Sequence, residues 1–233
     1  MKIDIWSDIR CPFCYIGKHN LEQALSQFKD GDKLEVVWHS YELDPTIETD
    51  ENINTLDYFV QNKGISKEQA QQMMHHPIEM GKELGLVFNF DKAVVANSFK
   101  AHRLIKLAQK HNKANEAEEA LFKAHFTDGV NIDDNQALLK IGKEIGIDVA
   151  EIEAIFTSDI YTQEVKQDIV RSQQLRISGV PFFVFNNKYA ISGAQPVETF
   201  TRALEKSYHE FAQENNIEIL NQGDSCDMDG NCD

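Results

Sequence analysis

Cysteine is scarce in this sequence, with four cysteines among 233 residues. With 42% hydrophobic residues, a chain of this length can bury a core without disulfide staples. This excludes a disulfide-scaffold protein, in which cysteines are far denser. We therefore expect the four cysteines to serve chemistry rather than architecture.

Basic residues are also few, 23 Lys and Arg against 38 Asp and Glu, which gives a net charge of −15. Such a surface repels phosphate groups, which argues against nucleic acid or an anionic membrane as a partner. No uninterrupted apolar run is long enough to span a bilayer. Lys2 and Asp4 fall where the apolar core of a signal peptide would start. We therefore expect a cytoplasmic protein, in which a dithiol is kept reduced and its disulfide is transient.

Two cysteines spaced as CxxC follow the first predicted strand, residues 3–6. Pro12 suits the first turn of a helix, because its missing N–H is not needed there. Cys11 would then lie at the helix N-terminus, where unpaired backbone N–H groups and the macrodipole favour a thiolate, the form that attacks disulfides. Cys14, one turn later, is placed to resolve a mixed disulfide. A helix after Cys14 is indicated by apolar residues that recur at the spacing of one helix face: Leu21, Ala24, Leu25 and Phe28.

The same CxxC pair is also half of a zinc site. A four-ligand zinc site needs a second pair of Cys or His residues with comparable spacing. The strand before the pair and the proline between its cysteines favour the redox interpretation, so we expect no metal here.

The middle of the chain has a helical pattern from about residue 54 to about residue 175. A strand at residues 34–39 precedes it, and the order strand, helix, strand indicates a right-handed crossover and a parallel pair. Ser66, with Gln69 three residues later, predicts a capping box at the start of one helix.

The hydrophobic period changes back near the C-terminus. Residues 181–186 and 189–192 predict two strands joined by a tight turn at Asn187-Lys188. A last helix follows, with apolar residues on one face between residues 197 and 211.

These elements predict an α/β protein with a thioredoxin fold, a mixed sheet in the order βαβ…ββα, interrupted by a large all-helical insertion. The predicted domains are the discontinuous thioredoxin-fold domain (1–45 and 177–213), the helical insertion domain (46–176) and a flexible tail (214–233) that contains two cysteines.

Three motifs carry a family resemblance: CPFCYIGK near the N-terminus, SGVPFFVFN before the hairpin and ISGAQP before the last helix. With helices between them, they resemble the DsbA-like thioredoxin superfamily, and its FrnE branch in particular, over residues 2–212. That family consists of thiol–disulfide oxidoreductases. The resemblance implies that Cys11 is the nucleophile, Cys14 the resolving thiol and Pro181 a cis-proline of the substrate groove.

The resemblance also implies a substrate-binding surface made by Pro12, Phe13, Val180 and Pro181, with the Val180 backbone facing the substrate disulfide. Phe13 stands where many DsbA proteins have histidine, so a hydrogen-bond donor to the Cys11 thiolate is missing. The site is therefore expected to be less oxidising than that of the periplasmic members.

Disulfide exchange of this kind requires no metal and no organic cofactor. The expected substrates are protein or small-molecule disulfides, and a glutathione or thioredoxin system is the expected recycling partner.

A second activity stays open, because the branch includes the glutathione-dependent isomerases, such as 2-hydroxychromene-2-carboxylate isomerase, related to kappa-class glutathione transferases. They resemble this chain in fold and in the segment with Asn97, His102 and Arg103, which would contact an anion or substrate from a lid. An ordinary helix face is the alternative for these three residues. Those enzymes typically carry serine in place of the first cysteine, so the presence of Cys11 and Cys14 favours dithiol exchange.

The tail cysteines, Cys226 and Cys232, allow several interpretations. The short loop between these two cysteines can close a disulfide. The pair would then relay electrons to or from the CxxC dithiol. The alternatives are adventitious oxidation or a non-enzymatic redox-sensing or zinc-binding module.

Overall fold

The fold was determined from a computed structural model, which describes residues 1–214 and, of Asp32, only the backbone. A four-stranded mixed sheet lies at its centre, in the order β2-β1-β5-β6. β1 pairs in parallel with β2 and antiparallel with β5, and β5 forms an antiparallel hairpin with β6. This confirms the predicted thioredoxin-type order. The strands are β1 (Lys2–Ser7), β2 (Glu35–Ser40), β5 (Phe182–Phe185) and β6 (Tyr189–Ser192).

The hairpin turn lies one residue earlier than predicted. Asn186 and Asn187 both have positive φ, 50° and 54°, and the Lys188 N–H donates to the Phe185 carbonyl. Two central residues of positive φ form the turn whose twist matches that of the flanking strands. Asparagine tolerates this left-handed backbone better than most residues, so Asn186 belongs to the turn rather than to the strand.

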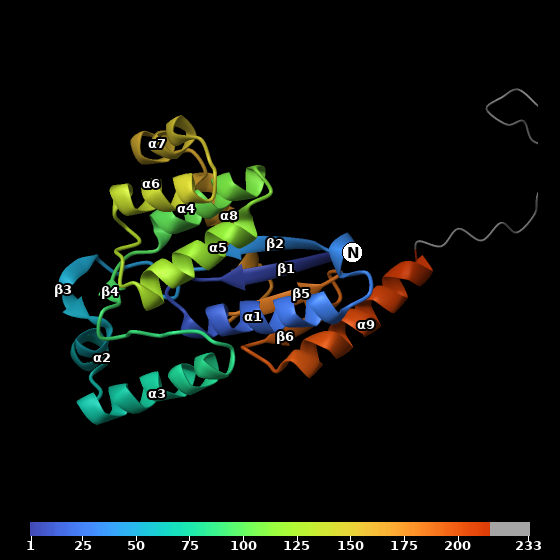
Figure 1. Ribbon diagram of the computed structural model, residues 1–233, viewed down its shortest axis with the longest axis horizontal. Coiled ribbons are helices and arrows are strands. Elements are labelled where there is room, and N and C mark those ends of the chain that lie inside the picture. Colours follow the sequence, from blue (N-terminus) through green and yellow to red (C-terminus); the bar gives the residue numbers. More distant parts are fainter. Residues whose placement is uncertain (215–233) are drawn as a thin grey trace, which may run out of the picture.

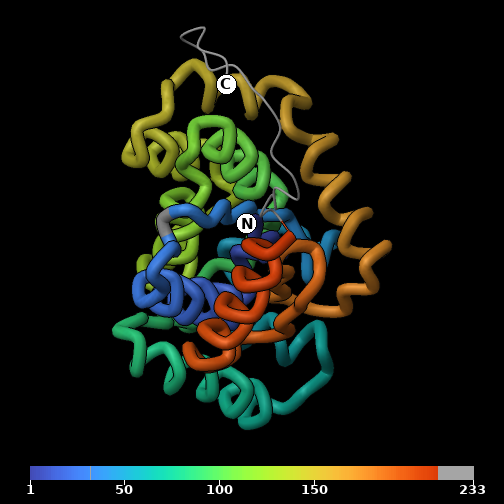
Figure 2. The backbone as a smooth tube through the Cα atoms, turned by 90° about the vertical axis from the view of Figure 1, so that its right-hand side faces the viewer, coloured from blue at the N-terminus to red at the C-terminus, as the bar shows by residue number. Residues whose placement is uncertain are grey.

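Helices cover both faces of the sheet. α1 (Pro12–Gln27) and α9 (Val197–Glu214) pack against each other on one face (Figure 1). α8 (Thr162–Gln174) packs on β2, and in Figure 2 it lies to the right of the strands whereas α1 lies to the left. β1 is buried from Ile3 to Ser7, as expected of a strand covered on both faces.

The segment between β2 and β5 is mainly helical, as predicted, but it is not all helical. β3 (Asp50–Asn54) and β4 (Val94–Val95) form a small antiparallel sheet in it. Their sequences, DENIN and VV, are too polar or too short to show the alternation that predicts a strand. The helices are α2 (Thr55–Lys63), α3 (Lys67–Glu83), α4 (Phe99–Lys110), α5 (Ala114–Phe122), its π-helical continuation η2 (Lys123–Thr127), α6 (Asn135–Glu144), α7 (Val149–Thr157) and α8, and a 3-10 turn, η1 (Gly31–Lys33), precedes β2.

The helices of this segment approach α1 from two sides. In Figure 1, α2 and α3 lie below the start of α1, and α4 to α7 lie above it. α3 contacts α1, and α4 and α5 contact β2. The start of α1, where the CxxC pair lies, is thus bordered by both groups of helices. The exact domain boundaries stay a prediction.

The predicted capping box at the start of α3 is present. Ser66 Oγ accepts a hydrogen bond from the Gln69 N–H, and Gln69 Oε1 accepts one from the Ser66 N–H. Each such cap satisfies a backbone donor that the helix itself leaves unpaired.

Aromatic packing connects α1 with the insertion. The Tyr15 ring stacks on Phe122 at 4.9 Å and meets the edge of Phe88 at 6.0 Å. Phe88 in turn meets Phe126 at 5.2 Å. Pairs of this kind contribute about 0.5–1.5 kcal/mol each beyond their burial. None of the helices in the described part of the chain combines the length and the apolar content needed to cross a membrane.

Candidate active site

Cys11 lies between the end of β1 and the start of α1. It is the N-cap residue of α1, and Pro12 occupies the first helical position, as predicted. The Cys11 N–H donates to the Asp8 carbonyl at 2.9 Å, and the Cys14 N–H donates to the Cys11 carbonyl at 3.0 Å. Both thiols are free and nearly inaccessible, with Cys11 4% and Cys14 1% exposed.

The loop before β5 lies against this pair. Cys11 Sγ donates to the Val180 carbonyl at 3.4 Å, and the peptide bond between Val180 and Pro181 is cis. α1 approaches this loop closely at Gly17, where an added Cβ would lie 3.0 Å from both Pro181 Cγ and Phe183 Cζ. The structure thus brings together the first cysteine and the Val180-Pro181 segment, which are about 170 residues apart in the sequence.

Cys14 is the more deeply buried of the two thiols. Burial raises the pKa of its thiol well above the ordinary value, and the neighbouring Cys11 adds to the shift. Hydrogen bonds from the Asp8 backbone and the Ser7 hydroxyl act in the opposite direction. Cys14 is therefore a protonated thiol at neutral pH.

A buried polar cluster lies next to the dithiol, made by Asp8, His102 and Glu118. Although burial opposes its ionisation, the contact with His102 holds the pKa of Asp8 below its ordinary value. Burial lowers the pKa of His102, but Asp8, 3.8 Å away, shifts it upward overall. Burial raises the pKa of Glu118 to about 7, and Glu118 Oε2 accepts a hydrogen bond from Ser7 Oγ at 3.5 Å. Of this cluster, the family resemblance indicated only His102.

An apolar cavity of about 310 Å³ opens beside Cys11. Pro12 and Phe13 line it, together with Val180. The opposite walls come from α2, α3, β4 and η2, and include Tyr58, Met74, Val95, His125 and Phe126. Arg10, immediately before the dithiol, also lines the cavity. Neither Arg10 nor His125 could be recognised from the sequence, because nothing in their spacing relates residue 10 to residue 125.

Asn97, His102 and Arg103 do not line this cavity. The Asn97 side chain donates to the Ile47 carbonyl and accepts from the Phe99 N–H. Arg103 donates to the carbonyls of two residues that follow α7, Ser158 and Ile160. The contact between His102 Nε2 and the Tyr41 carbonyl is 3.0 Å. All three are held by groups of the protein itself, and an anion-binding role for them stays a prediction.

The tail pair, Cys226 and Cys232, lies outside the described residues. The relay that the sequence suggests for it therefore stays a prediction as well.

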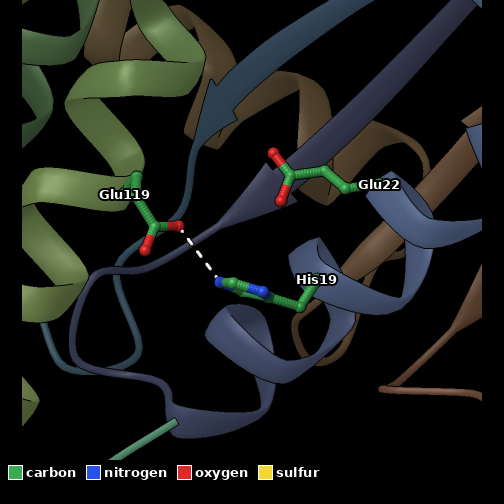
Figure 3. Close-up of side chains that lie close together, drawn as sticks. All are labelled: His19, Glu22 and Glu119. Atoms are coloured by element: carbon green, nitrogen blue, oxygen red, sulfur yellow. Dashed lines mark hydrogen bonds and ion pairs between the residues drawn. The ribbon is translucent and has the colours of Figure 1, made fainter. Parts of the chain in front are cut away.

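A cluster of side chains that could bind a metal ion lies farther along α1. Donor atoms of His19, Glu22 and Glu119 lie within 4.8 Å of one another (Figure 3). The ammonium group of Lys18, a side chain only 2% exposed, lies 2.7 Å from Glu119 and 2.9 Å from Glu22. Partial burial alone would raise the pKa of Glu119, but hydrogen bonds from His19, Lys18 and Tyr15 lower it to about 2. The ammonium group of one buried lysine thus pairs with both carboxylates in an ion-pair network, and the expectation that the protein holds no metal stays a prediction.

Another buried network connects β1, β2, α4 and α8. His39 bridges two carboxylates, with Nε2 2.6 Å from Asp4 and Nδ1 2.8 Å from Asp168. The Lys106 ammonium group lies 2.5 Å from Asp168, and the His39 ring stacks on Trp6 at 4.5 Å. A charged residue inside an apolar strand, Asp4, was the one sequence signal of this network. Its partners come from three distant segments and could not be paired from spacing alone.

The comparisons with known proteins agree with this geometry. The sequence matches the model of the DSBA-like thioredoxin domain family over residues 2–205. A protein described as a probable DsbA oxidoreductase from Streptomyces coelicolor has the same fold with 33% identity and a TM-score of 0.85, covering 100% of this chain and 98% of that chain.

Two more distant solved structures share the fold. One is 2-hydroxychromene-2-carboxylate isomerase, 15% identical with a TM-score of 0.68, covering 93% of this chain and 100% of that chain. The other is the cytosolic disulfide reductase DsbM from Pseudomonas aeruginosa, 15% identical with a TM-score of 0.65, covering 90% of this chain and 100% of that chain. DsbM has also been solved with GSH. At these identities the likeness is one of fold alone, and assignment to the FrnE branch stays a prediction.

Proposed function

Because the chain belongs to the DsbA-like thioredoxin domain family, we propose that it is a thiol–disulfide oxidoreductase acting through Cys11 and Cys14. One observation carries the proposal: two free thiols at the start of α1, the first of them in contact with the Val180 carbonyl. A substrate disulfide lying along Val180-Pro181 would present one of its sulfur atoms to Cys11.

The exchange follows from this arrangement. The Cys11 thiolate attacks one substrate sulfur, the substrate S–S bond breaks, and one substrate thiolate leaves. Cys14 then loses its proton and attacks Cys11 Sγ, which releases the second thiolate and leaves a Cys11–Cys14 disulfide. Because burial keeps Cys14 protonated, it does not compete with Cys11 as the first nucleophile. No metal or organic cofactor takes part.

The oxidised dithiol needs a thiol reductant before the next turnover, and glutathione or a thioredoxin system is the proposed source. The fold is shared with a protein named a cytosolic disulfide reductase and solved with GSH, which supports glutathione as the reductant and the cytoplasm as the location. In this proposal Cys226 and Cys232 serve as an optional relay between reductant and dithiol.

A glutathione-dependent isomerase of small aromatic molecules is the second candidate. The apolar cavity beside Cys11 favours it, together with the fold shared with 2-hydroxychromene-2-carboxylate isomerase. In that case bound glutathione, rather than Cys11, would supply the thiol.

Dithiothreitol-driven reduction of insulin by the wild type and three variants tests these proposals. We expect the wild type to reduce insulin and Cys11→Ser to fall to the rate of dithiothreitol alone. When it is mixed with insulin in the absence of dithiothreitol, Cys14→Ser should accumulate a mixed disulfide with insulin, detected by mass spectrometry. Cys226→Ser/Cys232→Ser should lose rate only if the tail relays electrons.

Undiminished insulin reduction by Cys11→Ser would contradict the dithiol mechanism. A wild type inert toward insulin, with a Cys11→Ser variant that isomerises an aromatic substrate in the presence of glutathione, would favour the second candidate.

A further inference from the structure

The proposed exchange uses Cys11, Cys14 and the Val180-Pro181 segment but leaves the adjoining cavity unassigned. Two of the residues that line it, Leu43 and Met73, are 49% and 53% exposed, so the cavity is open to solvent. Its volume, about 310 Å³, is at the lower end of the range for small-molecule sites. It therefore suits a small organic molecule rather than a polypeptide segment.

Among the described residues, two side chains of the cavity wall each have one buried nitrogen atom without a hydrogen-bond partner, and His125 is the first of them. It is 4% exposed, and its Nδ1 atom has no hydrogen-bond partner among the described residues. Burial, together with the nearby charge of Arg10, lowers the pKa of His125 to about 4. The ring is therefore neutral at pH 7, and the tautomer with a proton on Nδ1 can donate one hydrogen bond.

Arg10 is the second such group. Its Nη1 atom is buried without a hydrogen-bond partner in the described part of the chain, and its guanidinium carbon lies 5.8 Å from the centre of the Tyr58 ring. Arginine stays protonated in proteins, so this is a cationic donor with an unused N–H.

Three carboxylates, Asp8, Glu42 and Asp44, interact electrostatically with Arg10, and hydrogen bonds engage two of them elsewhere. Asp8 accepts hydrogen bonds from the backbone N–H groups of Arg10 and Leu43. Asp44 accepts hydrogen bonds from the Tyr58 hydroxyl at 2.7 Å and from Thr46. Within the described residues, no carboxylate lies within ion-pair distance of the guanidinium group.

We propose that this cavity binds a small aromatic disulfide that carries a carboxylate, with the ring among the apolar walls and the carboxylate accepting hydrogen bonds from Arg10 and His125. This substrate class follows from three observations. The cavity walls are apolar, two buried N–H donors line the cavity and one of them is cationic, and the Cys11 thiol lies at the edge of the cavity. A guanidinium forms charge-assisted hydrogen bonds with a carboxylate, and a carboxylate would satisfy donors that are costly to bury unpaired. This inference rests on the proposed function and names its substrate class.

The Cys11–Cys14 dithiol supplies the two electrons that the reaction at this site requires. Cys11 Sγ forms a bond to one sulfur of the aromatic disulfide, whose S–S bond breaks to release one aromatic thiolate. Cys14 then gives up its proton, bonds to Cys11 Sγ and releases the second thiolate. The substrate gains two electrons, and the protein dithiol loses two. Dithiothreitol, a dithiol reductant, restores the protein for another turnover.

Two disulfide probes of similar aromatic character test the proposal by stopped-flow absorbance. 5,5′-Dithiobis(2-nitrobenzoate) carries the carboxylate, and 4,4′-dithiodipyridine does not. With the wild type we expect the rate of thiolate release to saturate with the carboxylate probe. Arg10→Gln should raise the half-saturating concentration about tenfold, the loss expected for a charged hydrogen bond. His125→Phe should raise it about threefold.

The neutral probe and a matched variant are the controls. The comparison between the probes is the readout: each cavity variant should lose more with the carboxylate probe than with 4,4′-dithiodipyridine, because the missing contact is to a carboxylate. Arg202→Gln changes the net charge by the same amount as Arg10→Gln, but at an exposed position on α9. It should leave the reaction with both probes unchanged. If circular dichroism shows that Arg10→Gln does not fold, Arg10→Lys serves instead, since it keeps the charge but loses the planar fork.

Equal half-saturating concentrations for Arg10→Gln and the wild type would overturn this inference and leave the proposed function intact. So would an equal loss with both probes, or the same loss in Arg202→Gln. If the wild type reacts with neither disulfide at Cys11, the proposed function itself fails.

Discussion

Helix α1 borders two regions that bury charged groups in opposite ways. Near its N-terminus, the apolar cavity leaves one donor atom of Arg10 and one nitrogen of His125 without a partner in the described structure. Less than two turns after the CxxC pair, Lys18 lies between Glu22 and Glu119 and contacts both. The cavity thus has unpaired hydrogen-bond donors beside the Cys11 thiol, whereas the charged groups around Lys18 are paired with one another.

The difference separates groups that stabilise the protein from groups that are available to a ligand. The partners of a buried ion offset part of its desolvation cost, but a buried donor without a partner carries its full desolvation penalty. A fold keeps such a penalty most readily where a bound molecule relieves it. The same comparison predicts that substitutions in the paired region affect stability, whereas substitutions in the cavity affect binding.

Removing Lys18 should have the largest effect on stability. Lys18→Met keeps the length of the buried stem but leaves Glu22 and Glu119 without their shared cation. We expect the free energy of unfolding to fall by about 3 kcal/mol, at the lower end of the range for breaking a buried pair because both carboxylates are about one-third exposed. Urea denaturation measures it.

Lys123→Met is the matched control, because Lys123 pairs with Asp128 at the surface and is 60% exposed. Its effect should stay below about 1 kcal/mol. Equal losses in the two variants would show that the Lys18 pairs contribute no more than a surface pair.

The second prediction concerns Glu118, a carboxyl group buried close to the dithiol. Burial raises its pKa from an ordinary 4.5 to about 7. Between these values the folded state binds more protons than the unfolded state, so this group lowers stability as the pH rises from 4.5 to 7. The full cost, reached above pH 7, is roughly 3 kcal/mol at 1.36 kcal/mol per pH unit.

Glutamine carries no charge at any pH, so Glu118→Gln removes this pH-dependent cost. Relative to the wild type, we expect the variant to be more stable at pH 8 than at pH 5 by about 2 kcal/mol, measured by urea denaturation at both values. Exposed Glu116→Gln should show no such difference between the two values. A stability difference that is the same at pH 5 and pH 8 would contradict the assignment.

Local patterns predicted much of the fold. The capping box at Ser66 and Gln69 and the strands around the CxxC pair depend on neighbouring residues, and the structure has them. The hairpin turn was placed one residue late because two adjacent asparagines, Asn186 and Asn187, adopt the left-handed conformation. The small sheet of β3 and β4 was missed because its strands are held by pairing across about 40 residues rather than by their own pattern.

The candidate site was predictable only in part, because it too depends on contacts between segments that lie far apart in the sequence. Cys11 and Cys14 are recognisable from spacing, and Pro181 from a family resemblance. The cavity depends on Arg10 and His125 meeting across the insertion, and the Glu118 cluster depends on α5 packing beside β1. Sequence periodicity indicates which face of an element is buried, but it does not indicate which distant element covers that face.

The smallest expected effect on stability concerns Gly17, where α1 approaches the loop before β5. An added methyl group would lie 3.0 Å from Pro181 and from Phe183, so Gly17→Ala must displace one of them. Overpacking costs about 1–3 kcal/mol, and the better helix propensity of alanine offsets up to about 1 kcal/mol of it. We expect a net loss of about 1 kcal/mol in urea denaturation. Gly179→Ala, whose added methyl group would meet no atom within 4 Å, should change stability less. A Gly17→Ala variant more stable than the wild type would show that α1 can move away from Pro181 at no cost, so that the helix does not hold the loop against Cys11.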